Sequence, residues 1–161
     1  MKIRDIKVNH VREPLGFMMD EPPVVGYKVV GAQGSKQKSV RIRVFDGDGE
    51  TNLLYDSGEI LEALPVYPLM LTLAPRTRYV VKLDVVSDKG EKAAACTWFE
   101  SGKMGEPWQA DWIGAAKAED NAVPVLGKEF TLEKQVESAR RYVGCAGLIA
   151  LHLKGERGGN E

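Results

Sequence analysis

Hydrophobic and polar side chains alternate along much of the first hundred residues, with a period of two. The pattern is longest over 79–86 and recurs over 40–44, where arginines separate the aliphatic residues. A period of two places successive side chains on opposite faces of a strand, so that one face is buried and the other is solvated. The pattern predicts strands over 3–8, 24–30, 40–44, 53–58, 79–86 and 93–99.

The segments between these strands carry residues typical of turns. Glycine and aspartate are concentrated at 31–34, 46–49 and 88–90, where they favour tight reversals of the chain. Three prolines make 59–75 a loop with an edge strand rather than a helix. No apolar period of 3.6 is sustained before residue 100. Short strands at such regular spacing, with turns between them, predict an all-β sandwich.

One segment specifies the sandwich more closely. Residues 73–79 have the form L-x-P-x-T-x-Y, which resembles the start of strand F in the immunoglobulin-like sandwiches of fibronectin type III domains. In such a tyrosine corner the hydroxyl group bonds to backbone a few residues upstream. We therefore expect Tyr79 to contribute to the fold and not to chemistry.

The composition changes after residue 102. Residues 103–124 combine linker-type residues with Trp108 and Trp112. Aromatic rings can stack on sugars, but two tryptophans beside a proline and a glycine favour packing at a junction between two domains.

Beyond this junction the chain again has apolar stretches. Strands are predicted over 126–132, 137–143 and 146–153, and residues 154–161 resemble a hairpin turn whose return strand is missing. These strands either extend the first sandwich or begin a second domain that the chain does not complete. The second interpretation is favoured, because so few residues cannot bury a core of their own. The predicted parts are therefore a sandwich at 1–102, a junction at 103–124 and a partial second β domain at 125–161.

The charge composition excludes some classes of function. Lysine and arginine total 22, aspartate and glutamate total 23, and the net charge is −1, which excludes a strongly basic nucleic-acid-binding protein. The first hundred residues carry 14 basic and 14 acidic side chains. Their net charge is therefore zero, which gives no indication of an anionic partner. No apolar run is long enough to span a membrane. The N-terminus has no apolar signal region, so we expect a cytoplasmic protein, or a periplasmic or secreted one if a leader has been removed.

Few residues are candidates for chemistry. The two histidines, His10 and His152, have no carboxylate at ligand spacing, which argues against a metal site. The two cysteines, Cys96 and Cys145, exclude a framework of several disulfides, and two unpaired thiols are favoured over one bridge. Cys96, in an alanine-rich strand, is expected to be a small buried hydrophobic residue. The acidic turn at 46–50 lacks the ligand spacing of a calcium loop.

No nucleophile motif, phosphate-binding loop or cofactor motif is present. We therefore assign no catalytic, cofactor-binding or metal-binding residue.

Several motifs together resemble the N-terminal region of bacterial α-L-rhamnosidases of the large, multidomain, inverting type. Residues 108–114 have the form W-x-A-x-W-I-G, which is the most specific of them. The likeness extends from about Arg4 to Glu161, and further motifs that carry it lie at 55–60, 75–79, 88–90, 99–102, 124–130, 139–143 and 153–159.

The resemblance implies a fibronectin-like module followed by the start of a jelly-roll domain, with the catalytic acids in a later α/α barrel. It therefore implies an accessory, non-catalytic part of a glycosidase that hydrolyses terminal α-L-rhamnosides, with the remaining domains of the parent enzyme as its partners. It implies no cofactor, nucleic acid or membrane.

Two other hypotheses stay open. The chain could be a free-standing module that binds protein or carbohydrate. Alternatively, unpaired edge strands could join two copies into a homodimer, because exposed strand edges recruit further strands.

Overall fold

The computed structural model describes residues 1–16, 21–47, 49, 51–61, 64–115, 123–133, 135–137 and 139–158. The chain divides into two compact units, Met1–Gln109 and Ala110–Glu161. The boundaries predicted from the sequence, at 102 and 124, stay predictions.

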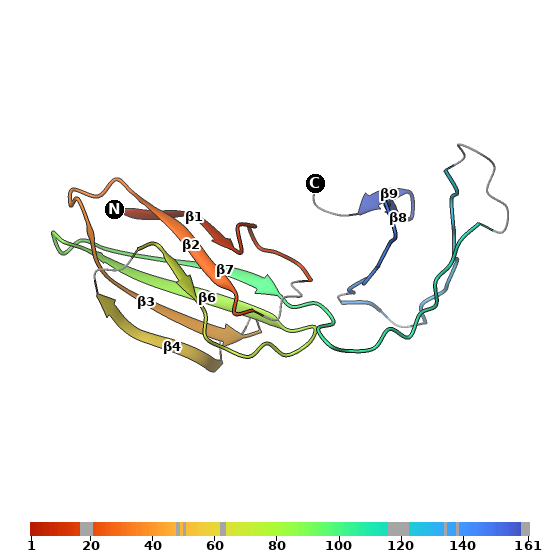
Figure 1. Ribbon diagram of the computed structural model, residues 1–161, viewed down its shortest axis with the longest axis horizontal. Helices are drawn as coiled ribbons and strands as arrows, with labels where there is room; N and C mark the ends of the chain where they lie inside the picture. The colour runs from red at the N-terminus through yellow and green to blue at the C-terminus, as the bar shows by residue number, and fades with distance from the viewer. Residues whose placement is uncertain are drawn as a thin grey trace. The chain divides into compact units, whose positions relative to one another are not determined.

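The first unit is a sandwich of two antiparallel sheets (Figure 1). One sheet has three strands in the order β1-β2-β5 and the other has four in the order β4-β3-β6-β7. The all-β, immunoglobulin-like fold class is thereby confirmed, and the edge strand expected within 59–75 is β5. The strands are β1 (Lys2–Val8), β2 (Val24–Val30), β3 (Gln37–Asp46), β4 (Asn52–Leu61), β5 (Val66–Pro68), β6 (Arg78–Ser87) and β7 (Lys92–Glu100).

The core lies between the two sheets and follows the predicted alternation. Along β6, the residues Tyr79, Val81, Leu83 and Val85 are all buried and belong to one hydrophobic cluster. The rings of Tyr79 and Phe99 stack with their centroids 4.9 Å apart. Aliphatic side chains from β1, β2 and β3 complete the cluster, and their burial is the main driving force for this fold.

β4 is longer than the strand predicted over 53–58, because the chain continues through a bulge within the strand. Its register against β3 shifts between Arg41 and Arg43, and Gly58 adopts a φ of 62°. The Ile42 N–H group donates to Ser57 Oγ over 2.8 Å, while the Gly58 N–H group donates to Asp56 Oδ1 over 3.0 Å. The Asp-Ser-Gly sequence thus forms a β-bulge and satisfies the backbone that the bulge leaves unpaired.

The second unit has little regular structure among its described residues. β8 (Leu151–Leu153) and β9 (Glu156–Gly158) form one antiparallel hairpin. Its turn contains Lys154 and Gly155, with φ values of 51° and 84°, as in the turns that suit two-residue hairpins. The prediction that the return strand is missing was therefore wrong.

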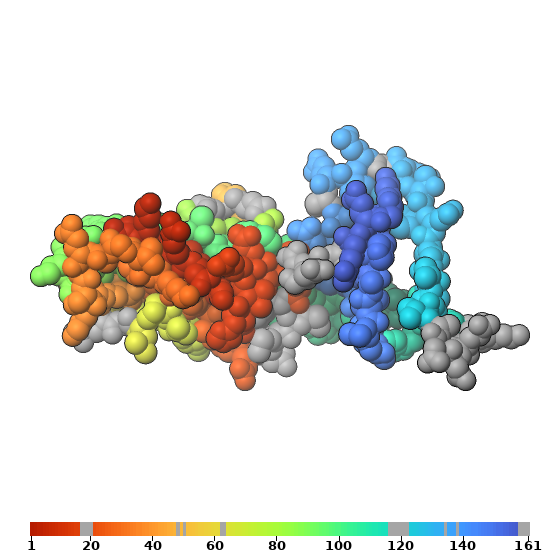
Figure 2. Space-filling view, turned by 90° about the horizontal axis from the view of Figure 1, so that it is seen from above, coloured from red at the N-terminus to blue at the C-terminus, as the bar shows by residue number. Residues whose placement is uncertain are grey.

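The strands predicted over 126–132 and 137–143 were also wrong, since the described residues there form no strand, and within 146–153 only β8 is a strand. Apolar runs suggested strands, but a strand also needs a hydrogen-bonded neighbour. In Figure 2 the light-blue and dark-blue parts of this unit form separate columns with open space between them. Many of its apolar side chains are exposed, among them Val125, Phe130 and Leu148.

Within the part of the chain that the structure describes, no helix has the length and apolar character needed to cross a lipid bilayer.

Candidate functional site

The segment that leaves the sandwich after β7 makes several hydrogen bonds and ion pairs. We call residues 101–108 the exit segment. Ser101, Gly102 and Lys103 are buried although they lie beyond the last strand of the sandwich. A buried loop must satisfy its polar groups internally, and this one does so against the loop that precedes β6.

Ser101 joins the exit segment to that loop. Its hydroxyl group is fully buried and donates to Ala74 O over 2.6 Å, while its oxygen accepts the Thr77 N–H group at 2.8 Å. The Ser101 N–H group donates to Thr77 O over 2.9 Å, which continues the pairing of β6 with β7 by one residue. Buried hydrogen bonds of this kind specify one path for the backbone.

Arg76 adds a second set of contacts. Its N–H group donates to Gly102 O over 2.8 Å, and its Nε lies 2.8 Å from Glu106 Oε2. Arg76 and Met104 have φ values of 51° and 50°, a conformation that is unfavourable for residues with a Cβ. The contacts on both sides of the segment hold this backbone in place.

Lys103 is the least expected member of the site. Its side chain is 6% exposed and its Nζ lies 3.9 Å from Glu106 Oε2. The ammonium donates to Pro107 O over 3.0 Å and lies 5.2 Å from the centre of the Trp108 ring. A buried ammonium needs such partners, because burial without them is very unfavourable. Lys103 thus holds the exit segment in a closed turn.

The tyrosine corner lies beside these contacts. The Ala74 N–H group donates to the hydroxyl oxygen of Tyr79 over 2.7 Å, which confirms the role expected of Tyr79. Ala74 therefore contacts two parts of the structure. Its N–H group bonds to Tyr79 of the core, and its carbonyl oxygen bonds to Ser101 of the exit segment. The sequence motif identified Tyr79. Arg76 and Ser101 lie within motifs that carry the family resemblance, but the pattern did not reveal their contacts, and it gave no signal for Lys103, because loop residues have no periodicity.

These groups hold the backbone of the exit segment in place through hydrogen bonds and an ion pair. They fix the direction in which the polypeptide leaves the sandwich, so residues 101–108 form a stiff connection and not a loose tether.

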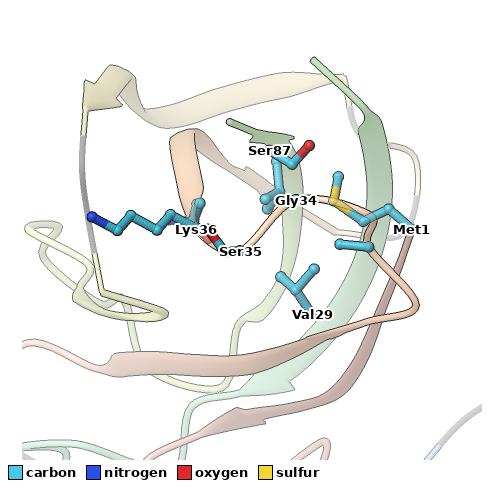
Figure 3. A pocket seen from close by; sticks show the side chains of 9 residues that line it. Met1, Val29, Gly34, Ser35, Lys36 and Ser87 are labelled. Carbon is cyan, nitrogen blue, oxygen red and sulfur yellow. The ribbon is translucent and has the colours of Figure 1, made fainter. Parts of the chain in front are cut away.

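A small cavity lies at the opposite end of the strands, between the loop after β2 and the turn after β6 (Figure 3). It has a volume of about 130 Å³ and its lining includes Met1, Val29, Ser35 and Ser87. Figure 3 shows Met1 and Val29 directed into it, while the Lys36 side chain extends away.

The polar groups around this cavity already have partners. Glu91 Oε2 accepts the Gln33 N–H group at 2.8 Å and the Gly34 N–H group at 3.3 Å, and Asp88 Oδ2 accepts from the Ser35 hydroxyl at 3.2 Å. These carboxylates fasten one loop to another. The cavity is therefore a structural feature.

The candidate residues for chemistry are dispersed. Cys96 and Cys145 are free and exposed, so the prediction that Cys96 is buried was wrong. Its position in β7 opposite Lys82 explains this, because that register places it on the solvent face of the sheet. Among the described residues, no group of His, Cys, Asp and Glu side chains could hold a metal ion. His10 and His152 are both exposed.

The two tryptophans of the predicted junction fall in different units. Trp108 is 51% exposed and Trp112 is 80% exposed. Trp108 contacts Lys103 within the exit segment. The expected packing between domains stays a prediction.

Two solved structures that resemble the chain are α-L-rhamnosidases. An α-L-rhamnosidase from Streptomyces avermitilis, solved in complex with L-rhamnose, is 28% identical with a TM-score of 0.60, and the match covers 70% of this chain and 12% of that one. An α-L-rhamnosidase from Dictyoglumus thermophilum is 21% identical with a TM-score of 0.58, covering 66% and 13%, and supports the fold alone. The chain therefore matches only a small part of either enzyme.

No curated protein matches the sequence. In contrast, a family of domains described as Rha78A-like, N-terminal immunoglobulin domain matches residues 3–105. These residues include all of β2 to β7, β1 except its first residue, and most of the buried turn after β7. The chain belongs to the family of the Rha78A-like, N-terminal immunoglobulin domain.

Proposed function

We propose that the chain is a non-catalytic accessory part of a glycoside hydrolase that resembles an α-L-rhamnosidase. Its task would be to fix the path of the polypeptide that leaves the sandwich and so to orient the remaining domains of the parent enzyme. The exit segment carries this proposal, because Ser101 and Lys103 are buried in a segment that a loose tether would leave solvated. The family match and the similarity to rhamnosidases support the setting.

The carboxylates near the cavity favour a non-catalytic role. Hydrolysis of a glycoside needs a protonated acid and a second carboxylate on either side of the scissile bond. Desolvation opposes ionisation of Asp88, but hydrogen bonds from Ser35 and the backbone lower its pKa overall. Hydrogen bonds from the Gln33 and Gly34 backbone lower the pKa of Glu91. Both carboxylates thus accept hydrogen bonds that favour their ionised form, which suits a role in holding the two loops together.

Two measurements test the proposal. The 161-residue chain should release no phenol from an aryl α-L-rhamnoside, whereas the product of the complete gene should do so. The reading frame should continue past the codon for Glu161 into further domains. Hydrolysis by the chain alone, or a stop codon after Glu161, would overturn the proposal and favour a free-standing module.

The role of the exit segment is tested in that complete product. Ser101→Ala removes the hydroxyl group that joins the segment to residues 74–77, and it should lower the temperature of inactivation. Ser35→Ala is the matched control, since it also removes a serine hydroxyl group, but one whose hydrogen bond to Asp88 is exposed to solvent. Equal effects of the two changes would contradict a special role for Ser101.

A further inference from the structure

The sandwich has four outermost strands, β1, β5, β4 and β7, and three of them are protected against pairing with another chain. β1 shifts its register against β2 near Asp5, which has a φ of 52°. β5 has only three residues and ends at Pro68. β4 contains the bulge at Gly58 and shifts its register against β3 twice. Bulges, short length and proline are features by which proteins keep edge strands from pairing.

β7 has none of these features. Its nine residues pair with β6 in one unbroken register, from Lys92 to Glu100. The strand contains no proline, and residues 93–99 carry no charged side chain. A long, regular and uncharged edge of this kind is the arrangement to which a further strand adds most readily.

The backbone of β7 directs hydrogen-bonding groups toward this edge. The Glu100 N–H group points away from β6, because it donates to Pro14 O over 2.9 Å. Alternate residues of a strand direct their N–H and C=O groups the same way, so Ala94, Cys96 and Trp98 also direct theirs away from β6. Up to Trp98, β6 is the one hydrogen-bonded neighbour of β7 among the described residues.

Solvent reaches β7 although β1 lies beside it. β1 belongs to the other sheet, where it is bonded to β2. Ala95 lies on the inward side of β7, opposite the buried Leu83, and yet Ala93 and Ala95 are only half-buried. Ala94 and Cys96 on the outward side are exposed. Side chains on both faces of the strand are therefore accessible.

We infer that two copies of the chain pair through β7, antiparallel and related by a two-fold axis at Ala95. This register uses the edge-directed groups of alternate residues from Lys92 to Trp98 in both copies. It joins the two four-stranded sheets into one continuous sheet. The outermost strands are then the two copies of β4, whose bulges oppose further addition, so the assembly closes at two copies. The inference goes beyond the proposed accessory role and does not depend on it.

The side chains along the edge favour a second copy over a strand of another protein. Domains that bind a foreign strand select it through pockets for its alternate side chains, whereas residues 93–96 are three alanines and a cysteine, which form a flat edge. In the inferred register Lys92 lies opposite Trp98 of the second copy, and symmetry produces this pair twice. A lysine beside an indole ring is a favourable cross-strand pair.

Sedimentation equilibrium of the 161-residue chain under reducing conditions tests the inference. The measured mass should rise with concentration from 17.7 kDa toward twice that value. Pairing of two strand edges buries little surface compared with a permanent dimer, so monomer and dimer should coexist within a range of about 1 μM to 1 mM. A mass that stays at that of the monomer over this whole range would overturn the inference.

Variants locate the contact. Ala94→Lys should weaken dimerisation roughly tenfold or more, because a lysine on an edge strand opposes pairing. Leu61→Lys in β4 and Leu148→Lys in the second unit add the same charge at other exposed positions and should leave dimerisation unchanged. Equal weakening in all three variants would assign the effect to net charge. Weakening confined to Leu148→Lys would assign the dimer to the second unit, and either result would overturn the inference.

Disulfide trapping tests the register. An antiparallel pair that exchanges no hydrogen bonds has its Cα atoms about 4.5 Å apart, which is within the range that a disulfide spans. When Cys96 and Cys145 are replaced by serine, Ala95→Cys should form a disulfide-linked dimer on oxidation. Ala93→Cys is the matched control, since it lies on the same side of β7 but away from the two-fold axis. Equal trapping of the two variants, or of neither, would overturn pairing centred on Ala95.

Discussion

Tyr79 shows how one side chain can serve two parts of the structure. Its ring is 1% exposed and stacks on Phe99, while its hydroxyl oxygen accepts the Ala74 N–H group. The ring therefore belongs to the core, and the hydroxyl group fixes the loop against which the exit segment is bonded. The two contributions can be separated by a substitution that keeps the ring.

Tyr79→Phe tests the hydroxyl group alone. It should lower the free energy of unfolding by about 1–2 kcal/mol, because the Ala74 N–H group loses its acceptor in a partly buried position. Urea denaturation measures the change. Tyr55→Phe is the control, and its half-buried ring should change stability by no more than about 0.5 kcal/mol. Similar losses in the two variants would contradict a specific role for the tyrosine corner.

At the scale of elements, β4 depends on a glycine in its interior. Gly58 has a φ of 62°, and a Cβ added there would meet nothing within 4 Å. Gly58→Ala should therefore destabilise the sandwich by about 1–2 kcal/mol through backbone strain alone. Gly105→Ala is the control, because that position is equally open but has no positive φ. Equal stability of the two variants in thermal unfolding would show that the bulge relaxes without a penalty.

The same bulge predicts a dependence on pH. A hydrogen bond from Arg41, and a second from the Gly58 N–H group, lower the Asp56 pKa from 3.8 to about 2. A carboxyl group with a lowered pKa in the folded state stabilises the fold above its unfolded pKa, and that contribution is lost as the pH falls. The melting temperature should therefore fall between about pH 4 and pH 2.

Asp56→Asn should reduce this fall, since the group that titrates is removed. Glu59→Gln changes the charge of the same strand by the same amount and leaves the contacts of Asp56 in place, so it serves as the control. A melting temperature that falls as steeply in Asp56→Asn as in the parent chain would assign the acid sensitivity to other carboxylates.

At the scale of the whole molecule, the two units should differ in resistance to protease. The first unit has a continuous core, whereas the described residues of the second form one short hairpin and expose many apolar side chains. Backbone with few buried contacts opens easily. Limited proteolysis followed by mass spectrometry should yield a stable fragment that ends near Gln109. Early cleavage within β1–β7 would contradict this division.

The sequence by itself determined the sandwich. Alternation along residues such as Val81, Leu83 and Val85 identifies strands, because a strand with one buried face needs a side-chain period of two. The motif around Tyr79 identified the corner, since both partners lie close together in the chain. Beyond residue 109 the same reasoning failed, because apolar runs such as 126–132 do not reveal whether a neighbouring strand exists.

Only the tertiary structure decided how distant residues meet. The exit segment forms hydrogen bonds with a loop that lies 24 to 27 residues earlier in the chain. A local sequence pattern does not predict hydrogen bonds between residues so far apart. Cys96 is exposed because strand register, not composition, decides which face it occupies. The balance of charge in the first hundred residues is a sum over the sequence, whereas a pair such as Arg43 and Asp84 forms because β3 and β6 lie side by side. Local periodicity fixes which residues are strands, and long-range packing fixes which surfaces they present.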